Sequence, residues 1–279
     1  MKNEIKMSCL PVSLFPMLAD GSLTLKEMAI KMKALGFDAM DVSFFHLKEH
    51  LPNNIKKIKQ DLEEAGLPIY MCCGYPDFTH PDELQRKREM DYLRSDIAMC
   101  SELGIPTIRV LAGQNHPETK REDGIRWAVE NLTEAAEYGR QYGVTLLFED
   151  HGKPTAWDCV DFTFVPENFL AIAKQLHENN SGVKINFDTG NIMAYGDDPL
   201  RVLKEVIGDV QTIHVFDMAK KGEVSPCLVG TGAVNFEEIF AYLKSVNWDG
   251  WLCIEELSRT GWDGVEKAGR YVRETWNKV

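Results

Sequence analysis

Strand-like and helix-like patterns alternate along the whole chain. Eight short apolar segments predict β-strands near residues 4–10, 38–43, 68–73, 107–111, 144–149, 183–188, 211–216 and 251–255. Helical patterns fill most of the gaps, as in the apolar stripe of Ile55, Ile58, Leu62 and Ala65. Eight strands that alternate with helices over this length predict a (β/α)8 TIM barrel.

Capping residues indicate where several of these helices begin and end. Thr24 and Glu27 have the spacing of a capping box, and glycines near the helix ends suit a left-handed terminal residue. Asp198 is followed by proline, which favours the first helical position. The predicted helix starts lie at Thr24, Asp82, Asp198, Asn235 and Asp263, and the predicted ends at Gly36, Gly66, Gly104 and Gly143.

The whole chain, residues 1–279, is predicted to form one barrel domain, because no linker or low-complexity segment interrupts the pattern. An open, doubly wound sheet is the alternative fold. No Gly-x-Gly-x-x-Gly sequence or Walker-type loop is present to favour it. The longest irregular stretch, about 152–166, follows the fifth strand. It would lie on the C-terminal face of a barrel, where substrates bind.

Each of the last four strands ends in a residue that can bind a metal ion, namely Glu149, Asp188, His214 and Glu255. Strand side chains alternate in direction, and one set in each strand is large and apolar, as in Leu146 and Phe148. That set should pack against the outer helices. The four residues then belong to the inward set, near the end of the barrel where active sites lie.

Three carboxylates around one narrow axis would repel one another, and unpaired buried charge is costly. A divalent cation removes this problem, so the four residues are predicted to bind one metal ion. The same alternation points Glu256 outward and favours Glu255 as the ligand. It also turns Arg109 and Asp41 inward, where each makes either a salt bridge inside the barrel or a substrate contact.

The composition limits the kinds of partner that the protein is expected to bind and the compartment in which it is expected. The net charge of −12 argues against binding to nucleic acid or to an anionic membrane, because both need a basic surface. No segment has the apolar length of a membrane span, and the N-terminus lacks the apolar region of a signal peptide. Seven scattered cysteines without zinc-binding spacing predict reduced thiols in a cytoplasmic protein.

Five motifs lie in the second half of the chain, one in each βα unit in order. They are Phe148-Glu149-Asp150-His151-Gly152, Phe187-Asp188-Thr189-Gly190-Asn191, His214-Val215-Phe216-Asp217, Gly230-Thr231-Gly232 and Gly250-Trp251-Leu252-Cys253-Ile254-Glu255. Together they resemble those of the xylose isomerase-like TIM-barrel superfamily, in the branch of sugar phosphate isomerases and epimerases that includes tagatose 3-epimerase and hydroxypyruvate isomerase. The resemblance covers essentially the whole chain and is strongest from Gly143 onward.

The resemblance implies that Glu149, Asp188, His214 and Glu255 bind one divalent ion. Mn²⁺ is expected first, with Mg²⁺, Co²⁺ and Zn²⁺ as alternatives. It also implies that Glu149 and Glu255 are the catalytic acid and base. The expected reaction is isomerisation or epimerisation of a sugar, polyol or keto-sugar, by removal of the proton next to a carbonyl through a metal-stabilised enediolate.

Five further residues are candidates for substrate binding, and most have an alternative role. Some epimerases of the group have histidine where this chain has Asn191, which can hydrogen-bond a hydroxyl but cannot titrate. Asp217 instead suits orientation of His214 or support of the metal site. A loop hydrogen bond is the alternative for His151, a salt bridge for Arg109 and a packed loop for Trp157. The candidates are His151, Asn191, Asp217, Arg109 and Trp157.

Three other functions compete with this prediction. Inosose and dehydroshikimate dehydratases resemble the same group and share the proton abstraction, so only loss of water separates them from an epimerase. A DNA-repair enzyme of the endonuclease IV type needs three zinc ions, more histidine ligands and a less acidic surface. A sugar- or metal-binding protein without activity would show no proton exchange. No phosphate-binding motif is visible, which favours an unphosphorylated sugar, and homo-oligomers are common in the group.

Overall fold

Eight β-strands occupy the segments that the apolar pattern predicted, and they form one parallel sheet. The computed structural model describes residues 5–47, 50–152 and 158–279. Hydrogen bonds join the strands in the order β1-β8-β7-β6-β5-β4-β3-β2. The strands are β1 (Lys6–Leu10), β2 (Met40–Ser43), β3 (Ile69–Cys73), β4 (Thr107–Val110), β5 (Thr145–Glu149), β6 (Lys184–Asp188), β7 (Val210–Val215) and β8 (Trp251–Glu255).

The sheet closes between β1 and β2 through hydrogen bonds near the start of both strands. The backbone N–H groups of Asp38 and Ala39 donate to the carbonyl of Met7, and the Asp38 carboxylate accepts from the Met7 N–H at 2.9 Å. The strands therefore surround a nearly closed barrel, and the predicted (β/α)8 fold of a single domain is confirmed.

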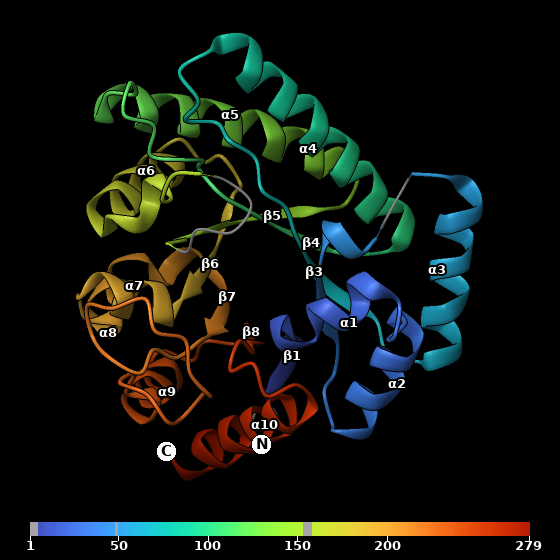
Figure 1. Cartoon of the computed structure of the whole chain (residues 1–279). Coiled ribbons are helices and arrows are strands. Elements are labelled where there is room, and N and C mark those ends of the chain that lie inside the picture. Colours follow the sequence, from blue (N-terminus) through green and yellow to red (C-terminus); the bar gives the residue numbers. More distant parts are fainter. Residues whose placement is uncertain (1–4, 48–49, 153–157) are drawn as a thin grey trace.

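Helices lie between successive strands and surround the barrel (Figure 1). They include short ones directly after β1 and β6 and long ones after β3 and β4. The α-helices are α1 (Phe15–Asp20), α2 (Leu25–Ala34), α3 (Pro52–Ala65), α4 (Glu83–Leu103), α5 (Arg121–Gln141), α6 (Pro166–Glu178), α7 (Thr189–Tyr195), α8 (Pro199–Val206), α9 (Phe236–Ser245) and α10 (Trp262–Lys278).

Most of the predicted caps are confirmed. The Thr24 side chain and Glu27 make the reciprocal hydrogen bonds of a capping box at the start of α2. Asp82, Asp198 and Asn235 likewise accept a backbone N–H at the starts of α4, α8 and α9. The prediction for α10 was wrong by two residues: Gly261 precedes the helix, so Asp263 lies in its first turn.

The core has an outer and an inner layer, as strand alternation predicted. Large side chains such as Phe148, Phe187 and Ile213 point outward and pack in the main cluster beneath the helices. A smaller apolar cluster fills the barrel itself and contains Leu147 and Cys253. The buried residues Glu149, Asp188 and Glu255 lie at the C-terminal ends of their strands, which is the end that carries the candidate site.

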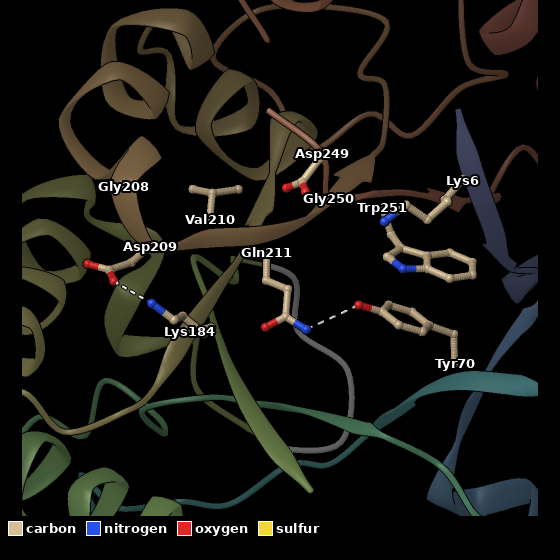
Figure 2. Close-up of a pocket in the computed structure, with 10 residues that line it drawn as sticks. All are labelled: Lys6, Tyr70, Lys184, Gly208, Asp209, Val210, Gln211, Asp249, Gly250 and Trp251. Atoms are coloured by element: carbon tan, nitrogen blue, oxygen red, sulfur yellow. Dashed lines mark hydrogen bonds and ion pairs between the residues drawn. The ribbon is translucent and has the colours of Figure 1, made fainter. Parts of the chain in front are cut away.

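The opposite end of the barrel has a polar pocket of about 320 Å³, formed by residues at the strand starts (Figure 2). The rings of Tyr70 and Trp251 stack there with centroids 4.0 Å apart, and Gln211 donates to the Tyr70 hydroxyl at 3.2 Å. Lys184 pairs with Asp209 at 2.9 Å. None of the predicted site residues lines this pocket.

All seven cysteines lie in the described part of the chain and are free thiols, as expected. Burial raises the pKa of Cys73 to about 12, which makes this thiol unreactive at neutral pH. Among the described helices, none is long and apolar enough to cross a membrane.

Candidate metal centre

The four predicted ligand residues meet inside the barrel. Glu149, Asp188 and Glu255 are the last residues of β5, β6 and β8, and His214 is the next-to-last residue of β7. Each is buried, and each offers a ligand atom, with all these atoms within 4.8 Å of one another. Four side chains from separate parts of the sequence therefore form one cluster at the C-terminal end of adjacent strands.

The imidazole of His214 lies among the three carboxylates. Its Nδ1 atom is 2.6 Å from Oε1 of Glu149. The same nitrogen is 3.4 Å from Oε2 of Glu255 and 3.8 Å from Oδ2 of Asp188. Burial alone would lower the pKa of His214, but the surrounding carboxylates outweigh burial and raise it above the ordinary value.

This donor set suits a divalent cation. Carboxylate oxygens and an imidazole nitrogen are ligands that Mn²⁺, Co²⁺ and Zn²⁺ accept, and Mg²⁺ accepts the oxygens. Oε2 of Glu149 is buried and accepts no hydrogen bond from the residues that the structure describes. The guanidinium group of Arg109 lies near this oxygen, but it offsets only one of three buried carboxylate charges, and Nε2 of His214 is also buried without a hydrogen-bond partner among the described residues. The cluster could therefore hold a metal ion.

Glu255 belongs to the cluster, and Glu256 does not. Glu256 is also buried, but its Oε1 atom accepts hydrogen bonds from the backbone N–H and the hydroxyl of Ser258. The two neighbouring glutamates thus point in opposite directions, as the alternation in β8 predicted.

Arg109 forms the salt bridge inside the barrel that was one of its two predicted roles. Its Nε atom lies 3.3 Å from Oε2 of Glu149, and its guanidinium group lies 4.7 Å from the ring centroid of Tyr75. Burial alone would raise the pKa of Glu149, but Arg109 and His214 hold it far below the ordinary value. A contact between Arg109 and substrate stays a prediction.

Asp41 faces the barrel interior as predicted, and its hydrogen-bond partners are Ser8 and the backbone of Met71. Its Oδ2 accepts from the Ser8 hydroxyl at 2.5 Å, and its Oδ1 accepts from the Met71 N–H at 3.1 Å. Burial raises the pKa of Asp41 from 3.8 to about 6, although Ser8 and His214 act in the opposite direction. Folding therefore favours the protonated form of this carboxyl group.

Asp41→Asn is expected to make the protein more stable than the wild type at neutral pH, with a smaller difference in acid. A folded-state pKa of about 6 lies above the unfolded value of 3.8, so the stabilising contribution is complete below pH 3.8 and lost as pH rises through 6. The variant should gain about 2.4 kcal/mol relative to wild type between pH 4 and pH 7. Urea unfolding with a chelator present measures this change. A pH-independent difference would show that Asp41 has the same pKa in both states.

His151 makes the loop hydrogen bond that was one of its two predicted roles. Its Nδ1 atom lies 2.7 Å from Oδ2 of Asp161, and its backbone N–H donates to the Thr163 hydroxyl at 3.2 Å. All three residues are buried. The carboxylate fixes the orientation of the imidazole ring. Whether the ring touches substrate is untested and stays a prediction.

The backbone of Asn191 is hydrogen-bonded beside the cluster, whereas its side-chain amide has no hydrogen-bond partner among the described residues. Its backbone N–H donates to Oδ1 of Asp188 at 2.8 Å, which places it beside the cluster. The side chain is 3% exposed, and neither its oxygen nor its nitrogen has a hydrogen-bond partner among the described residues. A buried amide in this state is a candidate for binding a substrate hydroxyl.

Asp217 anchors the loop that follows β7. Its Oδ2 accepts the backbone N–H groups of Gly230 and Gly232 at 3.0 and 2.9 Å, and its Oδ1 accepts that of Val234 at 3.2 Å. These bonds use both carboxylate oxygens, and none of them involves His214. Substrate contact by Asp217 stays a prediction.

Trp157, the remaining candidate for substrate binding, lies outside the described residues.

Two residues near the cluster received no role from the sequence. Asn186 donates to Oε1 of Glu149 at 2.6 Å, and the Thr212 hydroxyl donates to Oδ1 of Asn186 at 2.6 Å. Strand alternation already placed both side chains inside the barrel. That orientation, together with their polarity, was the signal that could have identified them.

Known proteins with similar sequences include enzymes of sugar metabolism. The chain is 26% identical to the L-ribulose-5-phosphate 3-epimerase UlaE of Salmonella paratyphi C over 239 residues, which cover 82% of this chain and 80% of UlaE. It is 28% identical to an inosose dehydratase of Bacillus thuringiensis over 285 aligned positions, which cover 91% of this chain and 90% of the dehydratase.

The same fold occurs in solved structures. That of a D-tagatose 3-epimerase-like protein has a TM-score of 0.78 and 20% identity to this chain, and the match covers 99% of this chain and 98% of the other. The family model of the xylose isomerase-like TIM barrel matches residues 30–275. With the eight-stranded barrel and the motifs along β5 to β8, this match shows that the chain belongs to the xylose isomerase-like TIM-barrel family.

Proposed function

We propose that the protein is a divalent-metal-dependent isomerase or epimerase of a sugar, polyol or keto-sugar. The observation that carries this proposal is the convergence of Glu149, Asp188, His214 and Glu255 within one buried cluster. The similarity to a ribulose-phosphate epimerase, and membership of a family that includes sugar epimerases and isomerases, support it. The strongly acidic chain is also a poor partner for nucleic acid.

The four residues of the cluster would hold the metal ion. A divalent cation bound there would polarise a substrate carbonyl and lower the energy of negative charge that develops on its oxygen. Mn²⁺ is the metal we propose first, because mixed oxygen and nitrogen ligation suits it, with Mg²⁺, Co²⁺ and Zn²⁺ as alternatives.

Glu149 and Glu255 are proposed as the base and acid, one on each side of the substrate. One glutamate, as a carboxylate, removes the proton next to the carbonyl, and the other, which must carry a proton as a carboxylic acid, then gives its proton to the enediolate. Return to the same carbon on the opposite face gives epimerisation, and return to the neighbouring carbon gives isomerisation. The low pKa of Glu149 keeps it ionised, as a base must be.

Asn191, Arg109 and His151 are proposed to bind the substrate. The buried side-chain amide of Asn191 has no partner among the described residues and can both donate to and accept from a sugar hydroxyl. Arg109 lies beside Glu149, so its guanidinium group can bind an oxygen of a substrate held there. His151 presents a ring whose orientation Asp161 fixes.

A dehydratase is the second candidate function, and two observations favour it. One of the similar proteins is an inosose dehydratase. In addition, Asp161 holds the buried imidazole of His151 in a fixed orientation at 2.7 Å, and a positioned histidine can serve as the general acid that supplies a proton to a leaving hydroxide. Proton abstraction by a glutamate is common to both reactions, so the fate of the hydroxyl group separates them.

A substrate panel in deuterated water tests both candidates. The metal content of the purified protein is measured first, and the protein is then incubated with pentoses, hexoses, their phosphates, inosose and other polyols. NMR should show deuterium entering one carbon of a sugar whose stereochemistry or carbonyl position changes. Release of water and an enone product would favour the dehydratase. Tight sugar binding with no exchange by metal-loaded protein would contradict both enzymes.

A further inference from the structure

A row of hydrogen bonds crosses three adjacent strands and ends at Glu149. Parallel pairing places Glu149 of β5 opposite Asn186 of β6, and Asn186 opposite Thr212 of β7. All three side chains face the barrel interior and are 0% exposed. The Asn186 amide nitrogen donates to Oε1 of Glu149 at 2.6 Å, and the Thr212 hydroxyl donates to the Asn186 amide oxygen at 2.6 Å.

The charge of Glu149 determines the direction of this row. An ionised carboxylate can only accept hydrogen bonds, so Asn186 must turn its NH₂ group toward Glu149 and its oxygen toward Thr212. Thr212 must then donate its only hydroxyl proton to that oxygen. A reversed amide would place its oxygen against the carboxylate oxygen and leave the NH₂ group facing Thr212. The carboxylate therefore selects one orientation of the Asn186 amide, and the Thr212 hydroxyl, which donates to the amide oxygen, holds the amide in that place.

Neither Asn186 nor Thr212 belongs to the cluster of candidate ligands. The Asn186 oxygen and nitrogen each have a partner in the row, and the residue is 0% exposed. Its one contact with the cluster is the bond to Oε1 of Glu149. Any effect of Asn186 on the site must therefore act through the position and ionisation of Glu149.

We propose that Asn186 is a positioning residue for Glu149 and that Thr212 holds the Asn186 amide in place. This proposal rests on the proposed function, in which Glu149 is both a metal ligand and a base. A glutamate side chain has three rotatable bonds, and both roles require its carboxylate to stay in one orientation. Asn186 holds one oxygen, and Arg109 lies 3.3 Å from the other.

Thr212→Val and Thr212→Ser form a matched pair for the test. Valine keeps the shape and the β-branch of threonine but lacks the hydroxyl, whereas serine keeps the hydroxyl and lacks the methyl group. Titration of Mn²⁺ into the metal-free proteins, followed by calorimetry, should show binding about ten- to a hundredfold weaker for Thr212→Val. Thr212→Ser should bind Mn²⁺ like the wild type. Thermal unfolding of the metal-free proteins shows whether both variants fold.

The reaction gives a second measurement once a substrate of the wild type is known. Thr212→Val should lower kcat about tenfold or more and leave KM unchanged, because Asn186 does not contact the substrate. Equal Mn²⁺ affinity in the valine and serine variants would overturn the positioning role. A wild type that binds Mn²⁺ but exchanges no substrate proton would contradict the proposed function alone, since the Mn²⁺ titration still decides the role of Asn186.

Discussion

Glu149→Gln and Glu255→Gln are each expected to slow solvent-deuterium exchange into the substrate by about a thousandfold or more. Glutamine has nearly the size of glutamate, but its amide cannot remove a proton from carbon. It also brings no negative charge to the cluster, so metal binding weakens as well. In Glu149→Gln, the glutamine amide would also lie next to two donors, Asn186 and Arg109, which contact the Glu149 carboxylate in the wild type.

Exchange is measured by NMR in deuterated water at saturating metal concentration, so that loss of the base is separated from loss of the metal. Glu256→Gln is the matched control, because Glu256 is a buried neighbour of Glu255 that lies outside the cluster. Its carbonyl oxygen can still accept from Ser258, so exchange should stay close to the wild-type rate. Full exchange in both Glu149→Gln and Glu255→Gln would refute their roles as base and acid.

Strand positions and side-chain directions were predictable because both depend on local sequence. An apolar set with a period of two fixes which face of a strand meets the helices, and the remaining set must face the axis. This argument was enough to distinguish Glu255 from Glu256, and it turned Asp41 and Arg109 inward. Helix caps were predictable for the same reason, because the capping residues Thr24 and Glu27 lie only three residues apart in the sequence.

The partners of the inward residues were not predictable, because they depend on the register between strands. Asp41 and Arg109 bind different groups, Ser8 in one case and Glu149 in the other. Asn186 meets Thr212 across the pairing of β6 and β7, which has a register shift between Ile185 and Asn186. A shift of one residue moves every side chain to the opposite face, and the sequence of a single strand does not contain this information.

The hydrogen-bond partners of Asp217, in the loop after β7, were likewise not predictable from the sequence. Asp217 was expected to orient His214 or to support the metal site, and its hydrogen bonds in the structure go to the backbone at residues 230–234. The Gly230-Thr231-Gly232 motif explains how this is possible. A Cβ atom on Gly232 would lie 2.4 Å from Oδ1 of Asp217, so only glycine lets the backbone approach the carboxylate so closely.

Adding a divalent metal is expected to raise the melting temperature of the metal-free protein by roughly 10 °C when the free metal is about a thousandfold above its dissociation constant. Such an excess corresponds to about 4 kcal/mol of stabilisation, provided that the unfolded chain binds the metal weakly. The physical reason is that the cation offsets the repulsion among three buried carboxylates within 4.8 Å of one another. Differential scanning calorimetry with Mn²⁺, Mg²⁺, Co²⁺ and Zn²⁺ measures the shift and ranks the metals.

Removing one ligand should remove most of this stabilisation. Asp188→Asn and His214→Asn keep polar side chains of similar size but lose a charge or the imidazole nitrogen, so the metal should raise their melting temperatures much less. The metal-induced shift in the wild type should also grow as pH rises through the raised pKa of His214, because the ion and the proton compete for the same imidazole. Glu256→Gln should keep the wild-type shift. An equal metal-induced shift in wild type, Asp188→Asn and His214→Asn would mean that the ion binds elsewhere on this acidic protein.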